Sequence, residues 1–264
     1  MKSRSDSGEP PSDASTIAGT SMISRAFSIL DAFTGVEKSV RLSDVADRTG
    51  LARPTALRIL GQLAGEGVVV REGARYRLGA RLWHLGMSAA VQRDLRDVAA
   101  PFLQDLHAAT RATVHLAIRQ ADEVLYLDRL AGSASVPVVS RVGGTLPLHS
   151  TGVGKVLLAH APDDTRERVL AALTRSTAYT LTNRALLNDQ LVQVRRRGYA
   201  TTSEEMTLGA CSVAVPIGTG DGPKVVAALG IVVPRVGRDV VRYVSAMQVA
   251  ARGITRSLAQ HESE

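Results

Sequence analysis

Cysteine is almost absent from the sequence, because Cys211 is the only one among 264 residues. A single cysteine excludes an internal disulfide and a metal site built on a CxxC pair, and it is typical of a reducing compartment. Long apolar runs are missing as well. The longest, Val225–Val233, has nine residues and includes a glycine, whereas a membrane-spanning helix needs roughly 18. The sequence therefore predicts a globular protein without a membrane span.

The first 19 residues have no apolar stretch of the kind found in a signal peptide, and they are rich in Ser, Pro, Gly and Asp. We expect a disordered tail over residues 1–19 and a cytoplasmic protein. The hydrophobic content of 45% and the remaining length suffice for one large or two medium domains. The formal net charge of +7 indicates an anionic partner, although charge alone does not separate nucleic acid from a membrane surface or from simple solubility.

Residues 20–80 have the pattern of three helices followed by a β hairpin. The first helix is expected to begin at Ser21, and the second to be capped by Ser43 and to stop at Gly50. Pro54 lies in the first turn of the third, where proline is favoured. Apolar spacing of three and four residues predicts the inward faces. These are Ile23, Ala26, Phe27, Leu30 and Phe33 on the first helix, and Leu57, Leu60 and Ala64 on the third.

The hairpin is predicted from strands at residues 68–70 and 75–78, joined by a turn at 71–74. Three helices and a hairpin in this order predict a winged helix-turn-helix, whose third helix enters the major groove of DNA. This helix and the hairpin carry five of the nine basic residues between positions 20 and 80. The predicted DNA-binding residues are Ser43, Arg53, Pro54, Thr55, Ala56, Arg58, Gln62, Arg71, Arg75 and Arg77.

Two other interpretations of this segment stay open at this point. Arginines on an exposed helix are often only a solvated face, and some winged helices bind proteins instead of DNA. A protein-binding module would have little affinity for DNA and no steep salt dependence.

The sequence also resembles a known protein family in both of its halves. Residues 21–86, which begin SMISRAFSILDAF and end GARLWHLG, closely resemble the DNA-binding domain of the IclR family of bacterial transcriptional regulators. The likeness continues through LPLHSTGVGKVLLA at 146–159, RRRGYATTSEEMTLGACSVAVPI at 195–217 and VVAALGIVVP at 225–234, in the order and spacing of the family. The resemblance implies gene regulation by operator binding, as a homodimer or homotetramer.

One departure from the family concerns the start of the recognition helix. The family often has a Ser-Thr pair where this chain has Pro54-Thr55, so the contact expected from the serine is absent. Arg58 matches a position where arginine is usual. We therefore expect Thr55 and Arg58 to be the main contacts.

The second half is predicted to be an α+β domain with a central antiparallel sheet flanked by helices. A connecting helix is expected over residues 81–97, followed by an effector-binding and oligomerisation domain over 98–264. A helix at 98–110, two strands around a turn at 120–122 and a final helix with a regular apolar stripe are the clearest elements. The glycines and prolines at Gly132, Pro137, Gly143, Gly144 and Pro147 predict a loop that forms a pocket wall. The resemblance agrees, since it implies a GAF-like effector domain.

Catalysis is not predicted. Gly154-Lys155 lacks the earlier glycine and the following Ser or Thr of a phosphate-binding loop, and no nucleophile elbow or metal-spaced pair is visible. Four histidines in this domain are each expected to be hydrogen-bonded structural residues: His107, His115, His149 and His160. We expect no enzyme, no cofactor and no metal. An enzyme acting through the second domain is the competing hypothesis, which a turnover assay would distinguish.

A ligand pocket is predicted at the helix that begins near Thr151. Its first N–H groups and the helix dipole favour an anion, although its glycines also fit a purely structural role in close packing. Family members that bind small carboxylates have polar side chains at the positions of Thr202, Ser212, Gly230 and Val232, and the last two are not polar here. The resemblance thus implies a roomier and less polar pocket for an organic acid that is aromatic or otherwise partly hydrophobic. The predicted effector-binding residues are Thr151, Gly152, Val153, Thr202, Ser212, Gly230 and Val232.

Overall fold

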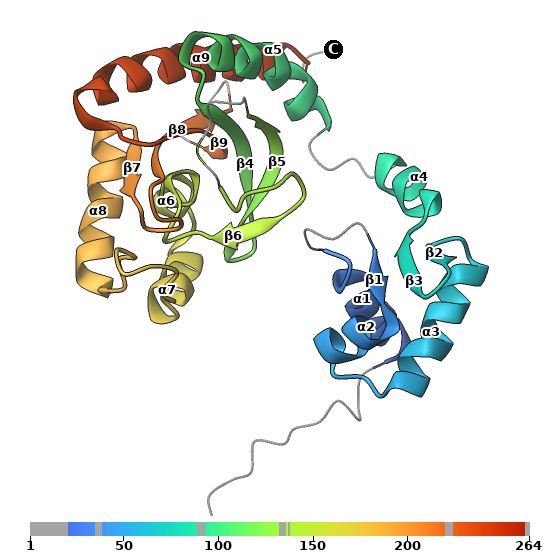
Figure 1. Ribbon diagram of the computed structural model, residues 1–264. Coiled ribbons are helices and arrows are strands. Elements are labelled where there is room, and N and C mark those ends of the chain that lie inside the picture. The colour runs from blue at the N-terminus through green and yellow to red at the C-terminus, as the bar shows by residue number, and fades with distance from the viewer. Residues whose placement is uncertain are drawn as a thin grey trace, which may run out of the picture. The chain divides into compact units, whose positions relative to one another are not determined.

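The computed structural model describes residues 21–34, 39–88, 93–131, 136, 138–219 and 224–261. The chain divides into two compact units, Met1–Ala90 and Val91–Glu264 (Figure 1). This division falls within the predicted connector, and the predicted domain bounds stay a prediction. The predicted tail at residues 1–19, Gly132 and Pro137 lie outside the described residues.

The N-terminal unit contains three helices and a small antiparallel sheet with strand order β1-β3-β2. The strand β1 was not predicted, because its two residues carry no alternating pattern; it pairs Val40 with Tyr76 of β3. The turn of the hairpin is shorter than expected, since Arg71 and Glu72 still pair with β3. The elements are α1 (Met22–Asp31), β1 (Val40–Arg41), α2 (Leu42–Thr49), α3 (Arg53–Gly65), β2 (Val69–Glu72) and β3 (Arg75–Leu78).

The core of this unit forms where α1, α2 and α3 meet the sheet, and Ile29, Val45 and Leu60 are fully buried there. Three residues predicted to face inward are exposed instead: Ile23 by 69%, Phe27 by 62% and Leu57 by 45%. The reason is that α1 and α3 carry apolar residues on two sides, so their spacing does not decide which side is buried.

Helix starts in this unit were predicted with mixed success. The Ser21 side chain accepts a hydrogen bond from the Ser24 amide at 3.1 Å, as expected for a cap of α1. The prediction of Ser43 as cap of α2 is wrong, because that helix begins at Leu42 with Arg41 at the cap position. The amide of Arg41 donates to the Asp44 carboxylate at 2.9 Å. The acidic residue therefore satisfies the start of the helix.

The predicted connecting helix over residues 81–97 corresponds to two helices, α4 (Ala80–Ser88) and α5 (Arg93–Thr110). The four residues between them lie outside the described residues. The end of α5 at Thr110 agrees with the prediction from the apolar spacing.

The C-terminal unit is built on a six-stranded antiparallel sheet with strand order β6-β5-β4-β9-β8-β7, which confirms the α+β prediction. The expected turn at residues 120–122 joins its first two strands. The strands are β4 (Thr113–Gln120), β5 (Glu123–Leu130), β6 (Thr145–Pro147), β7 (Ala200–Ser203), β8 (Cys211–Gly218) and β9 (Val225–Val233). The helices are α6 (Gly152–Ala159), α7 (Asp163–Ala171), α8 (Arg184–Arg197) and α9 (Val240–His261), with the short 3-10 helix η2 (Gly237–Asp239) before α9.

Helices cover both faces of this sheet. On one face, α5 and α9 pack on large side chains such as Leu116, Val215 and Leu229, and the predicted stripe of α9 is buried through Met247 and Ile254 (Figure 1). The other face packs against α6, α7 and α8. Its central positions hold small residues instead: Ala117, Ala214, Ala228 and Gly230.

The small residues let α6 approach the sheet very closely. A Cβ atom added to Gly152 would lie 2.4 Å from the Ser212 hydroxyl oxygen, and one on Gly230 would lie 2.6 Å from a methyl carbon of Val153. A Cβ on Gly154 would meet the backbone oxygen of Leu148 at 2.3 Å. The start of α6 is thereby held directly against β8 and β9.

Candidate functional site

The third helix of the N-terminal unit has one side buried in the core and one exposed polar side. Ile59 and Leu60 anchor α3 in the core, while Arg53, Arg58 and Gln62 are exposed. The Arg53 side chain forms no hydrogen bond or ion pair with the part of the chain that the structure describes. Arg58 has only a long contact of 4.0 Å from a guanidinium nitrogen to the Met22 sulfur. Both side chains are therefore available to an outside partner.

The arginines of the hairpin are partly occupied within the unit. Arg77 forms an ion pair with Glu72 at 2.5 Å. Arg75 donates to the backbone oxygen of Ser39 at 2.9 Å, and Arg71 lies over the Tyr76 ring at 5.9 Å. These contacts orient the wing but offset part of its positive charge.

One predicted DNA contact is wrong. The Ala56 side chain is fully buried in the core between the helices, so it does not face a partner. The reason is that Ala56 lies one turn before Leu60 on the inward side of α3. Ser43 is half-buried and its hydroxyl donates to the Asp44 carboxylate at 3.1 Å. The contacts predicted for Pro54 and Thr55 stay predictions.

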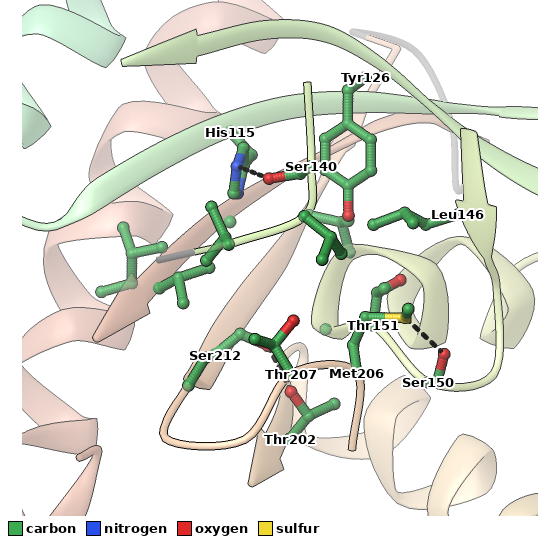
Figure 2. Close-up of a pocket in the computed structure, with 18 of the residues that line it drawn as sticks. His115, Tyr126, Ser140, Leu146, Ser150, Thr151, Thr202, Met206, Thr207 and Ser212 are labelled. Atoms are coloured by element: carbon green, nitrogen blue, oxygen red, sulfur yellow. Dashed lines mark hydrogen bonds between the residues drawn. The ribbon is translucent and has the colours of Figure 1, made fainter. Parts of the chain in front are cut away.

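A pocket in the C-terminal unit lies between the start of α6, the small-residue face of the sheet and the loops 138–146 and 204–210 (Figure 2). The space between its atoms amounts to about 480 Å³ when the solvent at its open mouth is included. The structure brings all seven predicted effector-binding residues together in its wall: Thr151, Gly152, Val153, Thr202, Ser212, Gly230 and Val232.

The start of α6 offers hydrogen-bond donors to this pocket. The Thr151 side chain caps the helix by accepting from the Gly154 amide at 3.1 Å. No acceptor for the amides of Gly152 and Val153 is found among the described residues. The hydroxyls of Thr202 and Ser212 lie 2.6 Å apart, so one donates to the other and one hydroxyl hydrogen stays available. Together these groups suit an anion.

The sequence did not point to the opposite wall of the pocket. His115 and Tyr126 come from neighbouring strands, and Ser140 comes from the loop before β6. Burial is the main cause that lowers the pKa of His115 to about 3, with the charge of Arg129 adding to it. Burial also raises the pKa of the Tyr126 hydroxyl. Both groups are therefore neutral near pH 7.

A buried ion pair fixes the loop that forms part of the pocket. The ammonium of Lys155 on α6 lies 2.6 Å from a carboxylate oxygen of Glu205, and its side chain is 1% exposed. A second bond joins the same ammonium to Gln190 of α8 at 2.8 Å. Glu205 precedes Met206 and Thr207, which line the pocket. Burial lowers the pKa of Lys155, and the carboxylate of Glu205 opposes this effect.

Other chemistry is not evident in the described residues. In these parts of the chain no cluster of three or more His, Cys, Asp or Glu side chains is placed to hold a metal ion. Four histidines of this unit are hydrogen-bonded, as expected: His107 to Ala112, His115 to Ser140, His149 to Thr174 and His160 to Val156. None of the described helices is long and apolar enough to span a membrane.

Each of the two units matches the model of a known protein domain. Residues 22–73 match the IclR helix-turn-helix domain, and residues 87–256 match the C-terminal domain of the bacterial transcriptional regulator IclR. The chain belongs to the IclR family. This chain is a transcriptional regulator with a helix-turn-helix DNA-binding domain, and members of the IclR family are regulators and not enzymes.

Related proteins cover most of the chain. The HTH-type transcriptional regulator KdgR of Dickeya chrysanthemi is 32% identical over 249 residues, which are 92% of this chain and 81% of that protein. XynR of Escherichia coli is 33% identical over 213 residues, 79% of this chain and 84% of XynR. The solved structure of an IclR homolog from Microbacterium hydrocarbonoxydans, complexed with 4-hydroxybenzoate, is 33% identical with a TM-score of 0.83. The structural match covers 90% of this chain and 99% of that homolog.

Replacing Lys155 tests the structural role of the buried ion pair in this IclR-family regulator. We expect Lys155→Met to lower the free energy of unfolding by about 3–5 kcal/mol, because Glu205 is left buried without a charged partner. The double variant Lys155→Met, Glu205→Leu should recover most of the loss. Urea unfolding followed by circular dichroism measures both. Equal losses in the single and double variants would contradict a dominant effect of the unpaired carboxylate.

The buried neutral state of His115 predicts a dependence of stability on pH. Its pKa is about 3 in the folded chain against 6.5 when unfolded, so between these values the unfolded chain binds one more proton. Stability should therefore fall as the pH falls from 6.5, by about 2 kcal/mol at pH 5 from this group. Urea unfolding at pH 7 and pH 5 should show a larger loss in the wild type than in His115→Leu. An equal loss would mean that folding does not lower the pKa of His115.

Proposed function

We propose that this regulator binds an operator through α3 and that a small carboxylic acid in the pocket of the C-terminal unit changes its affinity for DNA. The observation that carries the proposal is a helix start with available N–H groups inside an otherwise mainly apolar pocket. The DNA-binding and ligand-binding elements lie in separate compact units, which is the arrangement that a ligand-controlled switch needs.

DNA recognition rests on the exposed face of α3. A helix in the major groove reads bases with side chains of its first turns, and Arg53, Thr55 and Arg58 occupy such positions. Arg58 is our proposed base contact, since its guanidinium matches the two acceptors of guanine. Pro54 and Gln62 lie on the same helix near the DNA, and Ser43 on α2 near the backbone. The wing residues Arg71, Arg75 and Arg77 are proposed to contact phosphates.

The proposed effector is an aromatic or partly hydrophobic monocarboxylic acid. The amides of Gly152 and Val153, with the hydroxyl pair of Thr202 and Ser212, would hold its carboxylate. Val232 adds an apolar wall, and Val153 packs against Gly230 beside it. The homolog from Microbacterium hydrocarbonoxydans that was solved with 4-hydroxybenzoate supports this class.

We further propose repression by a homodimer or homotetramer. Helix-turn-helix dimers place two recognition helices on the two halves of a pseudo-palindromic site. The acid then shifts the population between arrangements of the DNA-binding units. A coupling of roughly 1–3 kcal/mol changes affinity about 5- to 150-fold, which is enough for a switch.

Arg58→Ala tests the recognition helix. We expect weaker binding by about 10- to 100-fold and reduced discrimination against a base change at the contacted position, because a bidentate base contact is worth roughly 1–3 kcal/mol. Fluorescence anisotropy with operator and mutated operator DNA measures both. Arg252→Ala is the matched control, since Arg252 is exposed on α9 and loses the same charge. Unchanged discrimination by Arg58→Ala would contradict the assignment of α3, and an absence of salt dependence in the wild type would favour a protein-binding module.

Val232→Ser tests the pocket. The wild type should bind 4-hydroxybenzoate, and the variant should bind a small polar acid such as pyruvate relatively better, because a hydroxyl replaces part of an apolar wall. Isothermal titration calorimetry with both acids gives the ratio of affinities, for which a shift of about 3- to 10-fold is expected. Val249→Ala, at an exposed position of α9, should leave the ratio unchanged. An unchanged ratio in Val232→Ser would remove this residue from the effector site.

A further inference from the structure

The pocket has a second polar pair, which lies away from the start of α6. His115 is 3% exposed, and its Nε2 lies 2.7 Å from the Ser140 hydroxyl oxygen. In Figure 2 this pair lies on one side of the pocket, while Thr202 and Ser212 lie on the other. The His115 ring also contacts Tyr126 edge to face, with centroids 5.0 Å apart. The position of the imidazole is therefore fixed from two sides.

The strand register gives the separation of the two polar pairs. His115 on β4 pairs with Gly230 on β9, which pairs with Ala214 on β8, and Ser212 lies two residues before Ala214. Two interstrand spacings of ~4.8 Å put at least roughly 10 Å between the two backbones. Gly230, between the two pairs, has no side chain, and Val153 of α6 packs against it. Because both pairs line the same pocket, a ligand the size of one substituted benzene ring can extend from one pair toward the other.

The two pairs differ in the hydrogen bonds that they offer. A neutral imidazole has one donor and one acceptor nitrogen, and a hydroxyl can donate and accept. When Nε2 accepts from Ser140, Nδ1 keeps its hydrogen; when Nε2 donates, the Ser140 hydroxyl hydrogen is available and Nδ1 accepts. Either tautomer leaves one donor and one acceptor. A ligand hydroxyl matches both, whereas a carboxylate can only accept.

The two ends of the pocket also differ in the charge that they offer to a ligand. Among the described residues that line the pocket, none is Lys, Arg, Asp or Glu. The helix start of α6 provides a partial positive charge for one carboxylate, whereas Arg129, whose charge acts on His115, does not line the pocket. Burying a second carboxylate there costs desolvation without a charged partner in the pocket wall. The far end of the pocket therefore suits an uncharged polar group.

We propose that His115 and Ser140 form a specificity element that binds a neutral hydroxyl at the end of the effector opposite its carboxylate. The inference rests on the proposed carboxylate site at α6 and deepens it. It defines the effector class as hydroxy-substituted aromatic monoacids, and it excludes unsubstituted acids and dicarboxylates as preferred ligands. Binding needs no covalent step, only the exchange of water for the ligand hydroxyl.

The test compares three acids of the same shape by isothermal titration calorimetry on the full chain. They are 4-hydroxybenzoate, benzoate and terephthalate, which place a hydroxyl, a hydrogen and a second carboxylate at the far end. The wild type should bind 4-hydroxybenzoate about 3- to 10-fold more tightly than benzoate, as expected for one or two neutral hydrogen bonds. Terephthalate should bind more weakly than benzoate.

Two variants assign this preference to the pair. His115→Leu and Ser140→Ala should each reduce the ratio of the two affinities to about 1 to 3 while still binding benzoate. Thermal unfolding checks that each variant is folded, and Ser140→Ala keeps the test valid if His115→Leu is not. Ser176→Ala, which makes the same change at an exposed site, should keep the wild-type ratio.

The outcomes separate this inference from the proposed function. Binding of benzoate and 4-hydroxybenzoate with equal affinity by the wild type overturns the inference and leaves the carboxylate site standing. Full discrimination retained in both variants overturns it as well. A failure of all three acids to bind overturns the carboxylate site, and the inference with it.

Discussion

The close contact between α6 and the sheet is the constraint on which the effector domain depends. It requires glycine on both sides, because Gly152 abuts Ser212 and Gly230 abuts Val153. The two interpretations of the glycines near Thr151, ligand binding and close packing, are therefore compatible. Without side chains at these glycines, α6 can touch the sheet, and the first backbone amides of α6 also stay uncovered. A larger side chain at either glycine would separate the layers and fill the cavity between them.

Polar groups in this domain have two separate tasks. Behind the cavity, the ion pair of Lys155 and Glu205 joins α6 to the loop 204–210, and the Gln190 amide completes the coordination of the ammonium. The hydroxyl of Thr180 donates to the Glu205 backbone oxygen at 2.7 Å and holds the same loop from another side. Inside the cavity, only neutral side chains and backbone amides are found among the described residues. Full charges thus shape the wall, and partial charges face the cavity.

The sequence alone predicted the burial of α9 and the start of α6 correctly, because each pattern lies within a single helix. The stripe of α9 from Val244 to Ile254 has one apolar side, and it is buried as predicted. The start of α6 could be located because Thr151 caps it and small residues follow. The family resemblance gave Thr202, Ser212, Gly230 and Val232 as further pocket positions, and the structure places them around that start.

The sequence alone did not predict features that depend on packing against residues far away in the chain. On α1, residues on two faces are apolar, and only the packing against α2 and α3 decides that Ile29 is buried while Phe27 is not. Ala56 shares a turn with Thr55 and Arg58, yet its side chain points into the core. His115 and Ser140 are 25 residues apart, and no local pattern marks them as a pair. Cross-strand register and loop placement supply that information.

The neutral lining has a consequence for the signal that the domain reports. Aromatic carboxylic acids lose their proton near pH 4, and the pKa of His115 is lowered to about 3, so neither partner titrates between about pH 5.5 and 8. Occupancy of the cavity would then follow the concentration of the acid alone. Acidification of the surroundings within that interval would leave the set point of the response unchanged.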